Sequence, residues 1–242
     1  MKNIALIFAG GIGKRMHSKD LPKQFLSIHD KPIIIRTIEH FQKHEKIDAI
    51  VVVCVAEYLD YCKQLITQYN LTKVISVVPG GETGQLSIYN GLVSAKKLVQ
   101  DEPTCILIHD GVRPLINKAV ISNCISSVEK YGSAITCVKA KETVLEIKDQ
   151  IVEDIPNRDS LLLARAPQCF ILDELLQEHE TALLKNITTF IDSASMMKSA
   201  GYQLHTVLGP EENIKVTTPD DFFLMRAILD LQENKQIYGI DD

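Results

Sequence analysis

The sequence predicts an α/β fold, a doubly wound, mostly parallel sheet with helices on both faces. The first half of the chain alternates short apolar runs with amphipathic stretches in four successive βα repeats, the arrangement that gives a parallel sheet. The run at residues 4–9 is continuously apolar, as in a strand buried on both faces. With 242 residues, 45% of them hydrophobic, the chain is long enough for one such core without disulfide bonds.

The strands and helices of this sheet are predicted in order along the first part of the chain. Apolar runs place the strands at 4–9, 49–55, 74–78, 104–108 and 134–138. The first helix begins at Pro32, which suits the first position of a helix, and buries Ile34, Ile38 and Phe41. Further helices are expected near 58–69, along the face of Ile88, Leu92, Ala95 and Val99, and near 119–130.

A β-hairpin arm is predicted at 141–157, where the pattern changes. Residues 143–147 and 151–155 alternate apolar and polar side chains on either side of a polar turn. An isolated two-stranded ribbon is only marginally stable. We therefore expect the arm to protrude and to pack on a second subunit, which makes a homodimer. A hairpin folded back on its own domain is the alternative.

The last third is expected to complete the same single domain, residues 1–242. Helices are predicted at 172–184 and 191–199, and strands at 203–208 and 214–216. The segment TPDD at 218–221 combines an N-cap residue, a proline at the first helical position and acidic residues in the first turn, all typical of a helix start. The buried face of this last helix is expected to carry Phe222, Met225 and Leu229.

Composition argues against several classes of partner. The formal net charge is -5 and the pI is about 5.8, which speaks against a broad basic surface for nucleic acid or anionic lipid. No apolar run approaches the roughly 20 residues that span a bilayer. The six cysteines form no CxxC pair and no zinc spacing with histidine, so we expect reduced, buried thiols in a cytoplasmic protein. They are Cys54, Cys62, Cys105, Cys124, Cys137 and Cys169.

The loop after the first strand is the first candidate site. It reads AGGIGKRM from Ala9 to Met16 and continues to Lys23, at the strand end where open α/β sheets bind ligands. Glycine lets backbone N–H groups approach phosphate oxygens, and Arg15 and Lys23 add positive charge. The loop matches neither the Walker A motif nor GxGxxG. A purely structural βα turn is the alternative, but the cations favour a triphosphate site.

Three further segments carry candidate site residues. Asp110 and Arg113 follow the fourth strand at the same sheet edge, where an acid can hold Mg²⁺ and an arginine can bind a phosphate. Gly80 and Ser87 border a helix start that offers hydrogen-bond donors to a base or sugar. Lys215 lies in an apolar stretch, where it needs an anionic partner. The alternatives are a loop cap, a surface ion pair and a lysine that extends to solvent.

These segments together resemble one family. In that family's order, the chain carries AGGIGKRM, PKQF, HDGVRP, the hairpin from Thr143, Arg158, APQCF, IDSAS and NIKVTTPDD. The family is that of the CTP-dependent cytidylyltransferases of the IspD/TarI type, which contains methylerythritol phosphate and ribitol phosphate cytidylyltransferases. The resemblance implies a Rossmann-like nucleotidyltransferase fold, dimeric through the hairpin arm. It also implies transfer of CMP from CTP to a polyol phosphate, with release of pyrophosphate.

The resemblance assigns a role to each candidate residue. The groups that neutralise the phosphates and the transition state are Arg15, Lys23 and Lys215. CTP is expected to contact Ala9, Gly10, Gly11, Gly80, Ser87 and Asp110, and Asp110 is also expected to hold Mg²⁺. The polyol phosphate is expected to contact Arg113, Thr143 and Arg158, partly across the dimer.

Three positions depart from the family pattern and bear on the two substrates. Gly84 replaces a usual arginine, Arg165 a common glutamine, and Ala166 the threonine of TPQ. We expect the acceptor to be a linear polyol phosphate such as ribitol 5-phosphate, a precursor of cell-surface polymers. The alternative is 2-C-methyl-D-erythritol 4-phosphate, an isoprenoid precursor, and IDSAS at 191–195 is closer to that type.

Two other functions are less favoured. A sugar-1-phosphate nucleotidyltransferase shares the first loop in outline, but its longer Gly-rich signature is not seen in this sequence. A non-catalytic nucleotide-binding protein on the same fold is expected to lose Lys23 or Lys215, and both are present.

Overall fold

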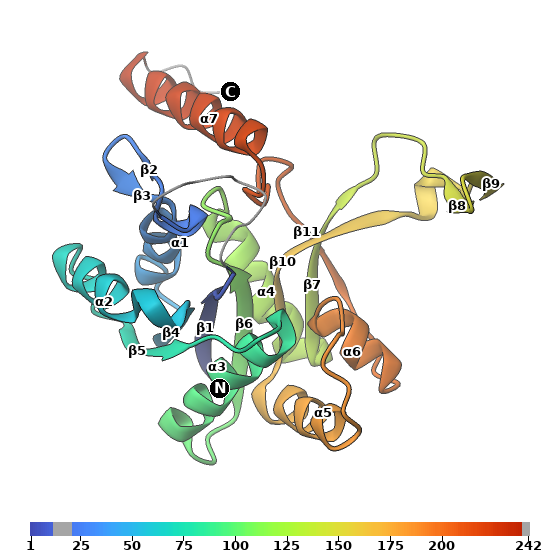
Figure 1. The fold of residues 1–242 in the computed structure, drawn as a ribbon, viewed down its shortest axis with the longest axis horizontal. Helices are drawn as coiled ribbons and strands as arrows, with labels where there is room; N and C mark the ends of the chain where they lie inside the picture. The colour runs from blue at the N-terminus through green and yellow to red at the C-terminus, as the bar shows by residue number, and fades with distance from the viewer. Residues whose placement is uncertain (12–20, 239–242) are drawn as a thin grey trace.

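A seven-stranded sheet with the order β11-β7-β10-β6-β1-β4-β5 forms the centre of the molecule (Figure 1). The structure is a computed structural model that describes residues 1–11 and 21–238. The strands are β1 (Lys2–Ala9), β4 (Ala49–Cys54), β5 (Val74–Pro79), β6 (Thr104–Asp110), β7 (Ser133–Lys139), β10 (Leu162–Ile171) and β11 (Thr206–Leu208). All neighbours are parallel except β10, which runs antiparallel between β6 and β7. The predicted mostly parallel sheet is confirmed.

Helices cover both faces of the sheet, as a doubly wound fold requires. One face carries α1 (Ile33–Gln42), α2 (Leu59–Gln68) and α4 (Lys118–Tyr131), and the other carries α3 (Gly84–Val99), α5 (Leu172–Leu184) and α6 (Ser193–Ser199). Strand β1 contributes to both cores, because Ala5 and Ile7 face one side while Ile4 and Leu6 face the other. The continuous apolar run therefore reflects burial on both faces.

Strand β10 was not predicted, because its sequence breaks the pattern of a buried strand. It carries Arg165 and Pro167 at its centre, and its register against β7 shifts between Ala164 and Gln168. Proline has no backbone N–H to donate to the neighbouring strand. The apolar residues on either side of this irregularity are too few to indicate a strand by themselves.

The predicted strand at 214–216 is wrong. These residues form an irregular segment that crosses the loop after β6, and the backbone N–H of Val216 donates to the Val112 carbonyl at 3.0 Å. The Val216 carbonyl accepts a hydrogen bond from Lys23 Nζ at 2.9 Å. The Lys23 side chain thus donates the hydrogen bond that a neighbouring strand would have donated to this carbonyl.

The predicted hairpin is present as β8 (Glu146–Lys148) and β9 (Ile151–Asp154), with strands shorter than expected. It extends away from the sheet in Figure 1 rather than folding back on the domain. Every residue of both strands is exposed. The large apolar side chains exposed along it are Leu145, Ile147, Ile151, Val152 and Ile155.

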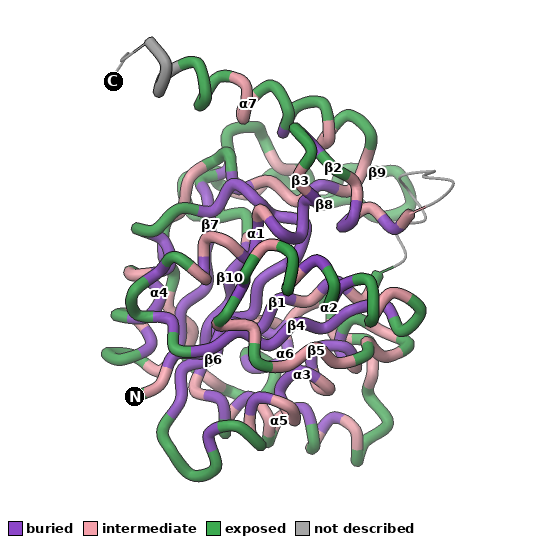
Figure 2. Tube along the Cα trace, turned by 90° about the vertical axis from the view of Figure 1, so that its left-hand side faces the viewer, coloured by how far each residue is buried: buried purple, intermediate pink, exposed green. Residues whose placement is uncertain are grey.

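The C-terminal helix α7 (Pro219–Tyr238) lies across the end of the domain, above a small third core (Figure 2). Met225 is fully buried there, and Phe222 and Leu229 pack against the same core. Asp221 accepts hydrogen bonds from the backbone N–H groups of Thr217 and Thr218, both at 2.8 Å, which fixes the start of the helix. None of the helices in the described ranges has the length and apolar character to cross a membrane.

Short elements complete the architecture. They are the strands β2 (Ser27–Ile28) and β3 (Lys31–Pro32) and the 3-10 helices at Lys23–Phe25, Ala56–Tyr58 and Arg158–Ser160.

All six cysteines are buried free thiols, which confirms the expectation from their spacing. Burial raises the pKa of Cys105, Cys137 and Cys169, and all six side chains lie among the core residues.

Candidate active site

Two adjoining cavities lie at the carboxyl ends of the parallel strands. The larger, of about 340 Å³, opens between β6, β10, α3 and α6, and the smaller, of about 250 Å³, lies against the loop after β1. Phe8, Asp110 and Lys215 line both cavities. We call them the acceptor cavity and the loop cavity. Ligands bound in the two cavities would therefore lie side by side. The wall between them is formed by the shared residues and carries one carboxylate, Asp110, and one amine, Lys215.

Asp110, the last residue of β6, is the centre of this wall. Its Oδ1 lies 2.6 Å from Lys215 Nζ, and its Oδ2 lies 2.7 Å from Arg113 Nε. Burial raises the pKa of Asp110, but the charges of Lys215 and Arg113 outweigh that effect and lower it to about 2. Asp110 is therefore an ionised, buried carboxylate that holds two cations at the boundary of the cavities.

Hydrogen bonds between distant segments place these cations. Arg113 Nη1 donates to the Asn213 carbonyl at 2.9 Å, and Asn213 Nδ2 donates to the Ala166 carbonyl at 2.7 Å. Lys23 Nζ donates to the Val216 carbonyl, next to Lys215. The loop that carries Lys215 is thus tied to β10, to the loop after β6 and to the segment after the first loop.

The first loop meets the start of α3 at very close range. A Cβ on Gly10 would lie 2.9 Å from Ser87 Oγ, and a Cβ on Gly80 would lie 3.0 Å from the same atom, so a larger residue at either position would displace Ser87. Ser87 Oγ accepts a hydrogen bond from Gly81 N at 3.0 Å. Gln24 Nε2 donates to the carbonyls of Ala9 and Gly11 and holds the loop in place.

The structure brings most of the predicted residues together. The loop cavity is lined by Ala9, Gly10, Gly11, Lys23, Asp110 and Lys215, and the acceptor cavity by Asp110, Arg113 and Lys215. Gly80 and Ser87 adjoin Gly10. Two predicted residues lie elsewhere, since Thr143 and Arg158 are exposed at the base of the arm, where Arg158 Nη1 donates to the Lys141 carbonyl. Arg15 lies outside the described residues.

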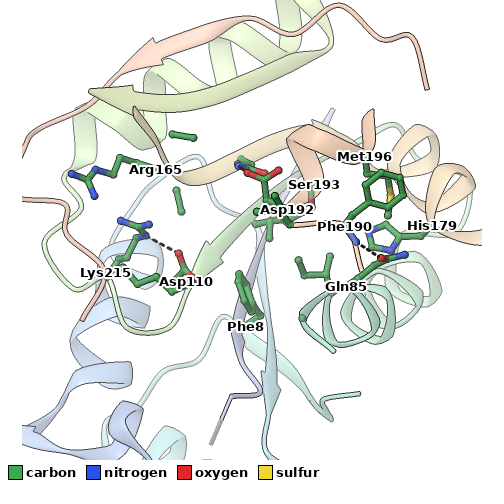
Figure 3. Close-up of a pocket in the computed structure, with 18 residues that line it drawn as sticks. Phe8, Gln85, Asp110, Arg165, His179, Phe190, Asp192, Ser193, Met196 and Lys215 are labelled. Carbon is green, nitrogen blue, oxygen red and sulfur yellow. Dashed lines mark hydrogen bonds and ion pairs between the residues drawn. The ribbon is translucent and has the colours of Figure 1, made fainter. Parts of the chain in front are cut away.

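The far side of the acceptor cavity contains polar residues to which the sequence analysis gave no role (Figure 3). Gln85 Oε1 accepts from Phe190 N at 3.0 Å. Gln168 Nε2 donates to Asp192 Oδ2 at 2.8 Å, and Asp192 caps α6 by accepting from Ser195 N. The signal available in the sequence was the capping pattern in IDSAS; its orientation toward a cavity depends on the tertiary fold.

Two buried histidines near the site are neutral at physiological pH. Burial lowers the pKa of His109 and of His179 to about 4. His179 lines the acceptor cavity at the end opposite Lys215 (Figure 3). Because neither ring carries charge at neutral pH, the positive charge of the acceptor cavity comes from its arginines and Lys215.

The residues of the wall fit a magnesium site of the substrate-dependent kind. In the described part of the chain, no group of three His, Cys, Asp or Glu side chains could hold a metal ion by itself. Mg²⁺ is commonly bound by one or two carboxylates together with substrate phosphates and water. Asp110 is ionised and lines the loop cavity. Its oxygens are paired with Lys215 and Arg113, but each keeps a further lone pair with which it would hold such an ion.

The arrangement is suited to joining two phosphorylated ligands. Backbone groups of a glycine loop and the amines of Lys23 and Lys215 line the loop cavity, a set that suits a triphosphate. Arg113 and Lys215 line the acceptor cavity, where a second phosphate can approach the first from the side. Charge stabilisation and positioning are the chemistry that such a set of residues provides.

Comparison with known proteins finds relatives that align along nearly the whole chain. The chain is 52% identical to the ribitol-5-phosphate cytidylyltransferase of Streptococcus agalactiae over 99% of its own length and 100% of that protein. It is 48% identical to the enzyme of the same name from Vibrio parahaemolyticus, over 98% of this chain and 100% of that one. It is 40% identical to the 2-C-methyl-D-erythritol 4-phosphate cytidylyltransferase of Clostridium botulinum, over 95% and 98%.

The solved structures point to the same group. The crystal structure of 4-diphosphocytidyl-2C-methyl-D-erythritol synthase from Anaerococcus prevotii superimposes with a TM-score of 0.81 at 27% identity, covering 95% of this chain and 96% of that one. The family model of 2-C-methyl-D-erythritol 4-phosphate cytidylyltransferase matches residues 3–231. The chain therefore belongs to the IspD family of cytidylyltransferases.

Proposed function

We propose that this protein transfers CMP from CTP to ribitol 5-phosphate, forming CDP-ribitol and pyrophosphate. The observation that carries the proposal is the wall shared by two cavities, in which Asp110, Lys215 and Phe8 line both. A triphosphate in the loop cavity and a polyol phosphate in the acceptor cavity would meet there. Relatives at 48–52% identity named for ribitol 5-phosphate support this acceptor.

The reaction is an in-line displacement at phosphorus. An oxygen of the acceptor phosphate attacks the α-phosphorus of CTP, the bond to the bridging oxygen of the β-phosphate breaks, and pyrophosphate leaves with both electrons. Lys23 and Lys215, together with Arg15, neutralise the charge that gathers on the leaving group and on the transition state. Asp110 orients Lys215 through its 2.6 Å contact. Positioning supplies most of the remaining acceleration.

Mg²⁺ is part of this proposal. Asp110 and the phosphates of CTP would hold the ion at the loop cavity. When bound, the ion neutralises phosphate charge and orients the triphosphate.

A homodimer formed through the arm is the second part of the proposal. The arm exposes a row of apolar side chains in isolation, and exposed apolar surface of this kind marks an interaction site. In a dimer, Thr143 and Arg158 could reach the acceptor cavity of the partner. The buried free thiols fit a reducing compartment, and we place the enzyme in the cytoplasm.

2-C-methyl-D-erythritol 4-phosphate is the second candidate acceptor. The 40% identity to a cytidylyltransferase named for that substrate supports it, as does the family model. Ala166 argues against it, because it leaves the acceptor cavity without the hydroxyl of the family's usual TPQ motif.

A pyrophosphate-release assay with a panel of acceptors tests the proposal. The purified protein is incubated with CTP and Mg²⁺ and, separately, with ribitol 5-phosphate, 2-C-methyl-D-erythritol 4-phosphate, glycerol 3-phosphate or a pentose phosphate. We expect the highest kcat/KM with ribitol 5-phosphate and no release without an acceptor. A higher kcat/KM with methylerythritol phosphate would reassign the acceptor, and equal turnover with UTP would overturn the assignment of CTP.

A further inference from the structure

Arg165 is a charged residue at the centre of a sheet strand, and the reaction outlined above gives it no role. It lies on β10 where the exposed half of the strand meets the buried half, between Ala164 and Ala166, and its side chain is half-buried. It lines the acceptor cavity on the same side as Lys215 and Asp110 (Figure 3). It also lines a third cavity, of about 260 Å³, beside the base of the arm. Arginine in such a position requires a partner.

The chain itself does not provide that partner. Within residues 1–11 and 21–238, Arg165 Nε is buried without a hydrogen-bond acceptor, and no carboxylate there lies within ion-pair distance of its guanidinium. Burial and the neighbouring charge of Arg113 both lower the pKa of Arg165, and Glu211 is the acid that opposes them. Glu211, however, forms its ion pair with Lys141.

The two carboxylates of the acceptor cavity are already engaged. Asp110 binds Lys215 with one oxygen and Arg113 with the other. Asp192 accepts from Gln168 Nε2 at one oxygen and from Ser195 N at the other. The described lining thus holds three cations, Arg113, Arg165 and Lys215, against two acids. An anion is the ligand that satisfies both the buried Nε and the excess positive charge.

We propose that Arg165 binds the phosphate group of the acceptor, a dianionic phosphomonoester, and is a specificity-determining residue of this enzyme. The guanidinium presents paired N–H donors whose spacing matches two phosphate oxygens. Together with Arg113, it holds the oxygens that do not attack, so that the third faces the α-phosphorus of CTP. The inference rests on the proposed function, and it adds a residue that the family pattern lacks at this position.

Substitution of Arg165 with separate KM values for each substrate tests this inference. In Arg165→Gln we expect the KM for the preferred acceptor to rise about tenfold, or about 1.4 kcal/mol, while the KM for CTP stays unchanged. Arg165→Lys should recover part of the loss, since it restores the charge but not the paired donors. In Arg165→Ala, added guanidinium ion should partly restore the KM for the acceptor. Arg226→Gln, an exposed arginine of α7, is the matched control.

Other outcomes would overturn the inference. An unchanged acceptor KM, or an equal rise in the KM for CTP, would remove Arg165 from the acceptor site. A variant that loses its dimer in light scattering would place the residue at the arm interface instead. Failure of the proposed function looks different, because the wild-type protein would then turn over no polyol phosphate at all.

Discussion

The active site and the arm reverse the usual distribution of side chains in opposite ways. In the site, charge is buried, since Asp110 is only 6% exposed and Arg113 only 7%. In the arm, apolar surface is exposed, since Ile147 is 67% exposed and Ile151 is 69% exposed. Charged residues are rarely buried unless they are paired, and a continuous exposed apolar row is rare in a monomer.

The two regions differ in whether the same chain provides the partner groups that such side chains need. The buried carboxylate of Asp110 is compensated within the same chain, by Arg113 and Lys215. The described residues offer the arm no such cover, because every residue of β8 and β9 is exposed. A substitution in the site should therefore act on one protomer, whereas a substitution in the arm should act on the contact between two.

The largest effect is expected for Asp110→Asn, which leaves the buried Arg113 and the partly exposed Lys215 without their counter-charge. We expect a loss of about 3–5 kcal/mol in the free energy of unfolding at pH 7, together with loss of turnover. Asp60→Asn, at an exposed carboxylate, is the control and should change stability by less than about 0.5 kcal/mol. Urea denaturation measures both values.

The pH dependence of the unfolding free energy, compared between the wild-type protein and Asp110→Asn, isolates the contribution of the ionised Asp110 carboxylate. The pKa of Asp110 is lowered to about 2 from its ordinary 3.8. Its ionisation therefore stabilises the fold fully above pH 4, and this contribution of about 2 kcal/mol is lost as the pH falls toward 2. The gap in unfolding free energy between wild type and Asp110→Asn should narrow over that window. A constant gap from pH 7 to pH 2 would contradict the assignment.

The next largest effect is expected for Lys215→Ala, and it concerns the activation free energy of the reaction rather than the free energy of unfolding. The substitution removes the amine that lines both cavities, so kcat should fall by about 10²-fold or more, or about 2.7 kcal/mol of transition-state stabilisation. Lys23→Ala should behave similarly. Lys198→Ala, at an exposed position on α6, is the matched control. Near-normal turnover in Lys215→Ala would exclude this lysine from the mechanism.

Parts of the molecule that depend on residues close together in the sequence could be predicted from it, and parts that depend on contacts between distant residues could not. Strands β1 and β4 could be predicted because burial on both faces leaves a continuous apolar run in the local sequence. Strand β10 could not, because Arg165 and Pro167 interrupt its apolar residues and its stability comes from pairing with β6 and β7.

The candidate site shows the same division. Strand-end placement predicted that Asp110 and the first loop would share one sheet edge. Beyond their contact with each other, however, Asp110 pairs with Lys215 and Arg113 donates to the carbonyl of Asn213, both about 100 residues away. The residues on the far side of the acceptor cavity, such as Gln85 and Asp192, are joined through contacts about 100 residues apart or within short caps. No local pattern encodes the pairing of Gln85 with Ile187, whereas the cap formed by Asp192 is local and left a signal in the sequence.

The smallest effect within one protomer is expected in the arm, where Ile147→Asp tests the other half of the comparison. Ile147 faces Val152 across the hairpin, and a cross-strand pair of this kind contributes about 0.2–1 kcal/mol. The unfolding free energy of the protomer should therefore change by less than about 1 kcal/mol. Dimerisation should be lost, as measured by light scattering, and deletion of residues 144–154 should give the same monomer.

The control for the arm is Leu184→Asp, which places the same charge at an exposed apolar position at the end of α5 and should leave the dimer intact. If Thr143 and Arg158 reach the partner's acceptor cavity, the monomeric variant will show a higher KM for the acceptor with an unchanged KM for CTP. A variant that stays dimeric would contradict the role of the arm. A monomer with unchanged kinetics would separate dimerisation from catalysis, because each protomer would then hold a complete site.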